Sequence, residues 1–105
     1  MKKIVVADDF SVTPGFRYES DGPNSGEEFR KKFLEPLFDD KDSDERILID
    51  LDGAAGYATS FLEEIFGGLA RKYGAEVCKR RLEIKSDEEP FLKEEIDEYI
   101  KNARA

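Results

Sequence analysis

Residues 46–70 read Arg46-Ile-Leu-Ile-Asp-Leu-Asp-Gly-Ala-Ala-Gly-Tyr-Ala-Thr-Ser-Phe-Leu-Glu-Glu-Ile-Phe-Gly-Gly-Leu-Ala70, and no other stretch of the chain carries a clearer structural signal. The nearly continuous apolar run at 47–51 is typical of a strand covered on both faces, and hence of a central strand. A turn rich in small residues follows, and a helix is expected to begin at Thr59 and Ser60. This layout places two hydroxyl groups at a helix N-terminus, beyond the carboxyl end of a strand, where anions bind and a phosphorylation switch would fit.

Apolar periodicity and turn signals place the other elements around this unit. The expected strands are residues 4–7, 16–19, 47–51 and 82–85, the last with one wet face and therefore near an edge. The expected helices follow a capping box at Ser25, the turn before Ser60, and Pro90. Pro36 should end or kink the first helix, and Gly74 should close the second. The order β-β-α-β-α-β-α predicts one α/β domain over residues 1–105.

Composition narrows the classes of function. The chain has 105 residues and a formal net charge of −8. An acidic surface repels phosphate groups, so neither nucleic acid nor an anionic membrane is the expected partner. Histidine is absent, which excludes Ser-His-Asp catalysis and histidine-ligated metal sites. The single cysteine, Cys78, cannot form an internal disulfide, and no segment reaches membrane-spanning length. A cytoplasmic location and no cofactor are expected.

Two carboxylates, Asp50 and Asp52, follow the apolar strand and raise the question of enzyme chemistry. They resemble the opening motif of haloacid-dehalogenase-type phosphatases, in which the first aspartate attacks phosphate and both carboxylates hold Mg²⁺. The chain after Gly53 is too short for the rest of that fold, and Ala54 stands where the motif has threonine. The favoured interpretation is that both aspartates are solvated or cap a turn. A Mg²⁺-dependent phosphoacceptor aspartate, as in receiver-like domains, is the remaining alternative.

The start of the second helix has a structural and a functional interpretation. Ser60 and Glu63 match a capping box, so Ser60 is predicted to be the N-cap of this helix. The alternative is that Ser60 or Thr59 accepts a phosphoryl group. Such a group would gain from the helix dipole and would be repelled by Glu63 and Glu64.

Glycine and basic residues outside this segment also admit two interpretations. The pair Gly67-Gly68 lies inside the predicted helix, where each glycine costs about 1 kcal/mol relative to alanine, which favours close packing over a partner surface. Arg17 is expected to form a surface ion pair, or alternatively to contact an anion or a partner near the helix start. The run Lys79-Arg80-Arg81 is expected to be a solvated entry to the last strand.

These pieces together resemble a STAS domain, the fold of anti-sigma factor antagonists and of the cytoplasmic part of sulfate transporters. The resemblance is closer to small STAS-like proteins of unknown function. The matching segments are Thr13-Pro14-Gly15-Phe16-Arg17, Ser25-Gly26-Glu27-Glu28-Phe29-Arg30, Ile49-Asp50-Leu51-Asp52-Gly53, Gly56-Tyr57-Ala58-Thr59-Ser60-Phe61-Leu62-Glu63-Glu64 and Phe66-Gly67-Gly68-Leu69. The resemblance implies a single STAS-like α/β domain with a four-stranded mixed sheet and about three helices.

In the antagonists, the turn before the second helix usually reads Asp-Ser-Ser-Gly-Leu, and a kinase that is also the anti-sigma factor phosphorylates a serine in it. On this chain the hydroxyls survive as Thr59 and Ser60, whereas Ala58 replaces the aspartate and Phe61 the glycine. The resemblance therefore implies a non-enzymatic regulatory module that is gated by phosphorylation at Ser60 or Thr59. It also implies a protein partner, such as a GHKL-type ATPase or a histidine-kinase-like regulator.

The expected partner-binding residues surround this turn. They are Arg17, Gly56, Tyr57, Ser60, Phe61, Glu63 and Glu64. Two other functions stay open. A small anion or a nucleotide would be held at the same helix N-terminus, with Arg17 nearby, or Asp50 and Asp52 would support Mg²⁺-dependent phosphate chemistry as weak metal candidates.

Overall fold

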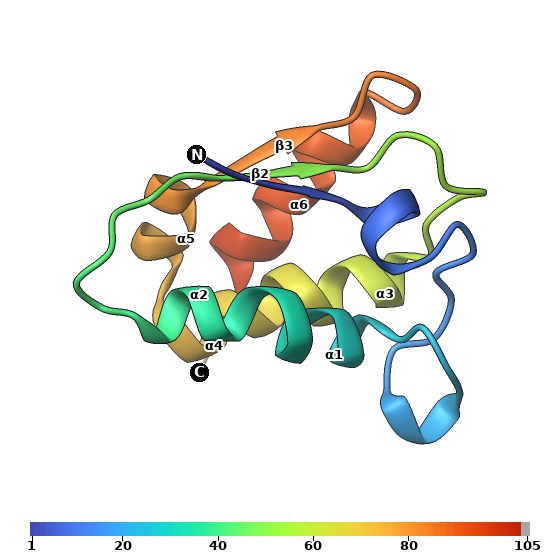
Figure 1. Cartoon of the computed structure of the whole chain (residues 1–105), viewed down its shortest axis with the longest axis horizontal. Coiled ribbons are helices and arrows are strands. Elements are labelled where there is room, and N and C mark those ends of the chain that lie inside the picture. Colours follow the sequence, from blue (N-terminus) through green and yellow to red (C-terminus); the bar gives the residue numbers. More distant parts are fainter. Residues whose placement is uncertain (104–105) are drawn as a thin grey trace.

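Three parallel strands form the sheet in the computed structural model, which describes residues 1–103. They are β1 (Lys2–Val5), β2 (Ile47–Asp50) and β3 (Leu82–Lys85), in the spatial order β1-β2-β3. Ile49 of β2 pairs with Ile4 on one side and with Ile84 on the other. The predictions of a central strand at 47–51 and of an edge strand at 82–85 are confirmed (Figure 1).

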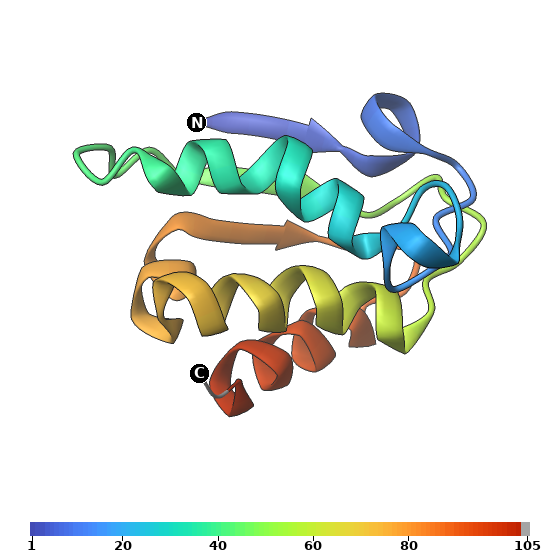
Figure 2. The same ribbon diagram turned by 90° about the horizontal axis from the view of Figure 1, so that it is seen from below.

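Two helical rods lie side by side on one face of the sheet (Figures 1 and 2). The first rod consists of α1 (Gly26–Phe29), the π-helical turn η3 (Arg30–Leu34) and α2 (Glu35–Asp39). The second rod consists of α3 (Thr59–Leu62), the π-helical turn η4 (Glu63–Gly67) and α4 (Gly68–Tyr73). After it come α5 (Ala75–Arg81) and α6 (Phe91–Asn102), and short helical turns η1 (Val6–Phe10) and η2 (Glu19–Asp21) precede the first rod. Within residues 1–103, no helix has the length and apolarity needed to cross a membrane.

The opposite face of the sheet is open. Ile4, Ile47 and Ile49 are at most 2 % exposed. Leu48, whose side chain alternates to the other face, is partly exposed. The expectation that the central strand is covered on both faces is therefore wrong. An apolar residue at position 48 does not require a second layer, because single apolar side chains are common on protein surfaces.

Residues 16–19 do not form the predicted strand, and the sheet has three parallel strands rather than four mixed ones. The carbonyl groups of Phe16 and Arg17 instead accept the backbone N–H groups of Gly26 and Glu27, at 2.8 and 3.0 Å. The first N–H groups of a helix have no partner within the helix, so this loop satisfies donors that an added strand would have left unpaired. The sequence also missed α5, which follows Gly74 directly.

The first rod begins as predicted and continues through Pro36. The Ser25 hydroxyl accepts the N–H of Glu28 at 3.0 Å, and the Glu28 carboxylate reaches back to the N–H of Asn24 at 3.2 Å. Pro36 lacks an N–H and would clash with the preceding turn of a regular helix. The π-helical turn just before it, in which Glu35 N–H bonds to the Arg30 carbonyl, absorbs this mismatch. The rod therefore runs on to Asp39 instead of ending.

The core fills the space between the sheet and the rods. Its largest fully buried side chains include Phe29, Phe61 and Phe66. The two rods approach closely at Gly26, where a Cβ would lie 2.5 Å from the Phe61 carbonyl oxygen. Glycine at this position lets the N-terminus of the first rod rest against the start of the second. This contact places α3 and the loop before α1 together.

Candidate functional site

The N-terminus of α3 carries the two hydroxyls predicted from the sequence, but its cap differs. The helix begins at Thr59, its N-cap residue is Ala58, and no side chain caps it. The prediction that Ser60 is the N-cap is therefore wrong. Thr59 is exposed and Ser60 is partly exposed. Because neither hydroxyl serves as a cap, neither is needed to start the helix.

Arg17 ties the loop at 11–24 to the second rod. Its Nη1 donates to Glu63 Oε1 at 2.7 Å and to Glu64 Oε1 at 3.2 Å. The hydrogen bond to Glu63 is the main cause that raises the pKa of Arg17. Three residues of the predicted site therefore lie together in the structure, where Arg17 forms ion pairs with both Glu63 and Glu64. The capping-box role of Glu63 is lost, because its carboxylate faces arginine side chains rather than the helix N-terminus.

The ion pair belongs to a longer network of alternating charge between the rods. Arg71 bonds to Glu63 at 2.7 Å, and Arg30 bonds to Glu64 at 2.5 Å. Burial alone would raise the pKa of Glu63, but the hydrogen bonds from Arg71 and Arg17 outweigh it and hold the pKa below its ordinary value. Glu64 is 7 % exposed, and both Arg17 and Arg30 pair with it. The network neutralises the carboxylates that would otherwise repel a phosphoryl group near Ser60.

Gly67 and Gly68 make room for this network. A Cβ at Gly68 would lie 2.5 Å from Arg30 Nη1, and a Cβ at Gly67 would collide with the Glu63 carboxylate. The predicted close packing at the glycine pair is therefore present, although it is directed at charged side chains and not at the sheet.

Asp50 and Asp52 bind backbone N–H groups and Lys85 at the carboxyl ends of the strands. Asp50 accepts the N–H of Asp52 at 3.0 Å, and Asp52 accepts the N–H of Glu88 at 2.9 Å. Lys85 Nζ lies 2.7 Å from Asp52 and 3.9 Å from Asp50. The N–H of Glu88, followed by Lys85, lowers the pKa of Asp52 to about 2. These contacts match the interpretation of turn-capping carboxylates, and the Lys85 ammonium occupies the position beside them that a cation would take.

The remaining predicted partner residues differ in their access to solvent. Tyr57 donates its hydroxyl to the Leu51 carbonyl at 2.7 Å, so it anchors the turn. Phe61 is 0 % exposed and lies in the core. Phe61 therefore cannot contact a partner in this structure, and Glu64 presents little surface. The prediction for these two side chains is corrected, because position in a predicted turn says nothing about which way a helical residue faces.

Three exposed apolar side chains on the loop before α1 are not predicted from the sequence. Val12, Phe16 and Tyr18 are 55 %, 45 % and 46 % exposed. The Val12 carbonyl accepts the N–H of Ala55 at 2.8 Å, and Arg17 joins the same loop to the second rod. We call this loop cluster, together with Thr59 and Ser60, the docking face. The alternation of aromatic and charged residues at 16–19 is the only signal for these side chains in the sequence, and it is equally typical of a strand.

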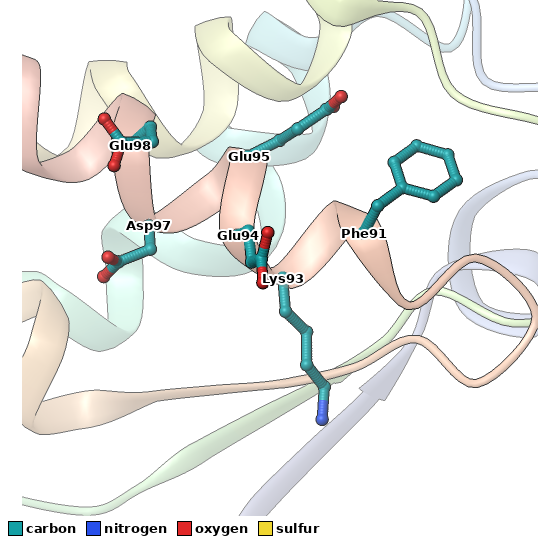
Figure 3. Close-up of a pocket in the computed structure, with 6 residues that line it drawn as sticks. All are labelled: Phe91, Lys93, Glu94, Glu95, Asp97 and Glu98. Carbon is teal, nitrogen blue, oxygen red and sulfur yellow. The ribbon is translucent and has the colours of Figure 1, made fainter.

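A separate hollow lies along α6 and has a volume of about 610 Å³. It is lined by Phe91, Lys93, Glu94, Glu95, Asp97 and Glu98. Figure 3 shows these side chains pointing away from the helix in different directions rather than toward one point. Among residues 1–103, no group of three or more acidic or cysteine side chains is arranged to hold a metal ion. This hollow is an acidic helix surface without a convergent site.

The chain matches the model of a known protein family. The model of a STAS-like domain family of unknown function matches residues 25–91, which is more than half of the chain. No curated protein and no solved structure matches the chain significantly. The matched segment contains both rods, the central strand and the edge strand β3.

Proposed function

We propose that this chain, which belongs to the STAS-like domain family, is a non-enzymatic cytoplasmic module that regulates a protein partner by binding it through the docking face. The observation that supports the proposal is the exposure of three apolar side chains, Val12, Phe16 and Tyr18, on the loop that contacts the turn before α3 and the second rod. Exposed apolar side chains that form one continuous surface are typical of protein interaction sites. The resemblance to anti-sigma factor antagonists favours a GHKL-type ATPase or a histidine-kinase-like regulator as the partner.

Phosphorylation at Ser60 or Thr59 is the proposed gate. Ser60 lies one helical turn before Glu63 and Glu64, so these three residues share one side of the helix. A phosphoryl group on Ser60 would compete with both carboxylates for Arg17, which now bonds to them. Loss of those bonds would release the loop that carries the apolar cluster. Modification would therefore change both the charge and the shape of the docking face.

The test is capture of partners from host lysate with tagged protein, with and without ATP, while the mass of the bait is measured. Phe16→Ala should weaken partner binding, because it removes an apolar side chain from the docking face. Phe91→Ala is the matched control, since Phe91 is similarly exposed, at 54 %, but lies on α6. One added phosphate mapped to Ser60 or Thr59 would support the gate. If Phe16→Ala, Ser60→Glu and Ser60→Ala all bind every captured partner as the parent does, the proposal fails.

A further inference from the structure

Arg81 is a buried charge without a carboxylate partner. It is 3 % exposed, and it donates from Nε to the Glu45 carbonyl at 3.1 Å and from Nη1 to the Leu37 carbonyl at 2.8 Å. Its guanidinium also lies 5.1 Å from the centre of the Phe38 ring. Within residues 1–103, no carboxylate forms an ion pair with it. The two carbonyl groups and the ring stabilise this charge in part, but no carboxylate among the described residues balances it.

The other buried charged side chains are paired, which makes Arg81 the exception among the described residues. Glu64 bonds to Arg30 and Arg17, and Asp50 lies 3.9 Å from the Lys85 ammonium. The sequence-based expectation that Arg81 is solvated with its neighbours is wrong. Arg81 is the last residue of α5, and the helix turns it inward while its neighbour Arg80 stays exposed.

Arg81 lines a pocket of about 280 Å³ between the end of α2, the loop at 40–46, α4 and α5. Lys41, Lys72 and Arg80 also line it, together with Asp40. Lys72 pairs with Glu35 at 2.9 Å and Arg80 with Asp44 at 3.3 Å, so among the described lining cations only Lys41 and Arg81 have no ion-pair partner. These two positive charges exceed the single charge of Asp40, which favours an anion in the pocket although the formal net charge of the chain is −8.

The same pocket has an apolar wall. The Phe38 and Tyr73 rings lie 5.2 Å apart, tilted at 42°, and both line the pocket with Val77. Its volume is just below the range of about 300–1,000 Å³ that is usual for ligand sites. A pocket of this size accommodates one charged head group and a small apolar group.

We infer that this pocket, the Arg81 pocket, binds a small organic oxyanion, whose phosphate or carboxylate group compensates Arg81 and whose apolar part lies against Phe38 and Tyr73. The pocket lies beside residues that precede β2 and β3, at the amino ends of the strands. The docking face lies at the other end of the molecule, beyond the carboxyl ends (Figure 1). The inference is therefore independent of the proposed partner-binding function.

The test is a titration of backbone amide signals by NMR at constant ionic strength. The probes are inorganic phosphate, phenyl phosphate and benzoate, with chloride as the reference anion. The pocket variant is Lys41→Gln with Arg80→Gln, because both side chains are exposed and their loss leaves the buried Arg81 in place. The matched control is Lys93→Gln with Lys101→Gln, which removes the same charge from exposed positions on α6.

The inference predicts that at least one probe shifts the amide signals around Arg81 and Tyr73, and that phenyl phosphate binds more tightly than inorganic phosphate. The pocket variant should weaken binding by about tenfold, as expected for the loss of two exposed charges, and the control should not. Binding of benzoate alone would assign a carboxylate ligand, and binding of the phosphates alone a phosphorylated one. No shift around the pocket with any probe, or equal affinity in the pocket variant and the control, would overturn the inference.

Discussion

Replacing Gly68 by alanine should destabilise the protein, although alanine is the better helix former. In a helix interior this exchange gains about 1 kcal/mol from backbone propensity. A Cβ at Gly68, however, would lie 2.5 Å from Arg30 Nη1 and 3.1 Å from Arg30 Cδ. The guanidinium must move, and it would give up its hydrogen bonds to the carboxylate and the carbonyl of Glu64.

The magnitude follows from the burial of the pair. The side chains of Arg30 and Glu64 are 13 % and 10 % exposed, so water replaces the lost bonds only in part. Hydrogen bonds to charged groups contribute about 1.5–3 kcal/mol, and Arg17 still pairs with Glu64, which limits the loss. A loss of about 2–3 kcal/mol less the propensity gain leaves a net destabilisation of about 1–2 kcal/mol. For a domain of this size, each kcal/mol lowers the melting temperature by about 4–8 °C.

The assay is urea unfolding of a double-mutant cycle with Arg30→Ala. Without the arginine the clash disappears, so Gly68→Ala should then stabilise the protein by about 1 kcal/mol. Gly67→Ala is the control, since its Cβ meets the Glu63 side chain, which is 24 % exposed and can turn toward solvent. If Gly68→Ala changes stability equally in both backgrounds, within about 0.5 kcal/mol, the reasoning is refuted.

Three further predictions concern Asp52, the Cys78 thiol and the N-cap of α3. Asp52→Asn should lower stability at neutral pH. The parent should lose stability as the pH falls from about 4 to about 2, because protonation of Asp52 weakens its hydrogen bond from the N–H of Glu88, the main cause of its lowered pKa. Asp52→Asn should not show this loss of stability. Urea unfolding across this pH range measures both effects, and the same pH dependence in the variant and the parent would contradict the prediction. Burial raises the pKa of Cys78 to about 11, so its reaction with a disulfide reagent at pH 8 should be slow in the native protein and fast in denaturant. Ala58→Asp should stabilise α3 by about 1 kcal/mol, whereas Ser60→Ala should change stability by less than about 0.5 kcal/mol; a larger loss in Ser60→Ala would show that Ser60 caps the helix after all.

Much of the secondary structure could be predicted because its causes are local. The apolar runs at 4–7 and 47–51 indicate strands, although β1 covers Lys2–Val5 and the helical turn η1 begins at Val6. The Ser25–Glu28 pair starts a helix by hydrogen bonds that span three residues. The apolar stripe of the second rod predicted its buried face, since Leu62, Ile65 and Leu69 are at most 1 % exposed. These signals depend on backbone geometry over one or two turns, which neighbouring residues determine.

The candidate site could be predicted only in outline. The sequence identified the turn before α3 and its two hydroxyls, but it assigned the cap to Ser60 and counted Phe61 as a surface residue. It named Arg17 as a contact near the helix start without identifying its partners. Glu63 and Glu64 lie more than forty residues farther along the chain, and only the packing of the loop against the second rod brings them within 3.2 Å.

The sequence by itself determined the approximate positions of the three strands, the start of the first rod at Ser25, the apolar face of the second rod, and the family that the chain resembles. The tertiary structure alone decided that residues 16–19 cap α1 instead of joining the sheet, and that Lys85 closes the aspartate pair. It also decided that Arg81 is buried without a carboxylate partner in the described chain. The periodicity of apolar residues indicates whether a side chain suits a buried or an exposed position. Which charged groups surround that side chain depends on segments far away in the sequence, and these segments meet only when the rods pack on the sheet.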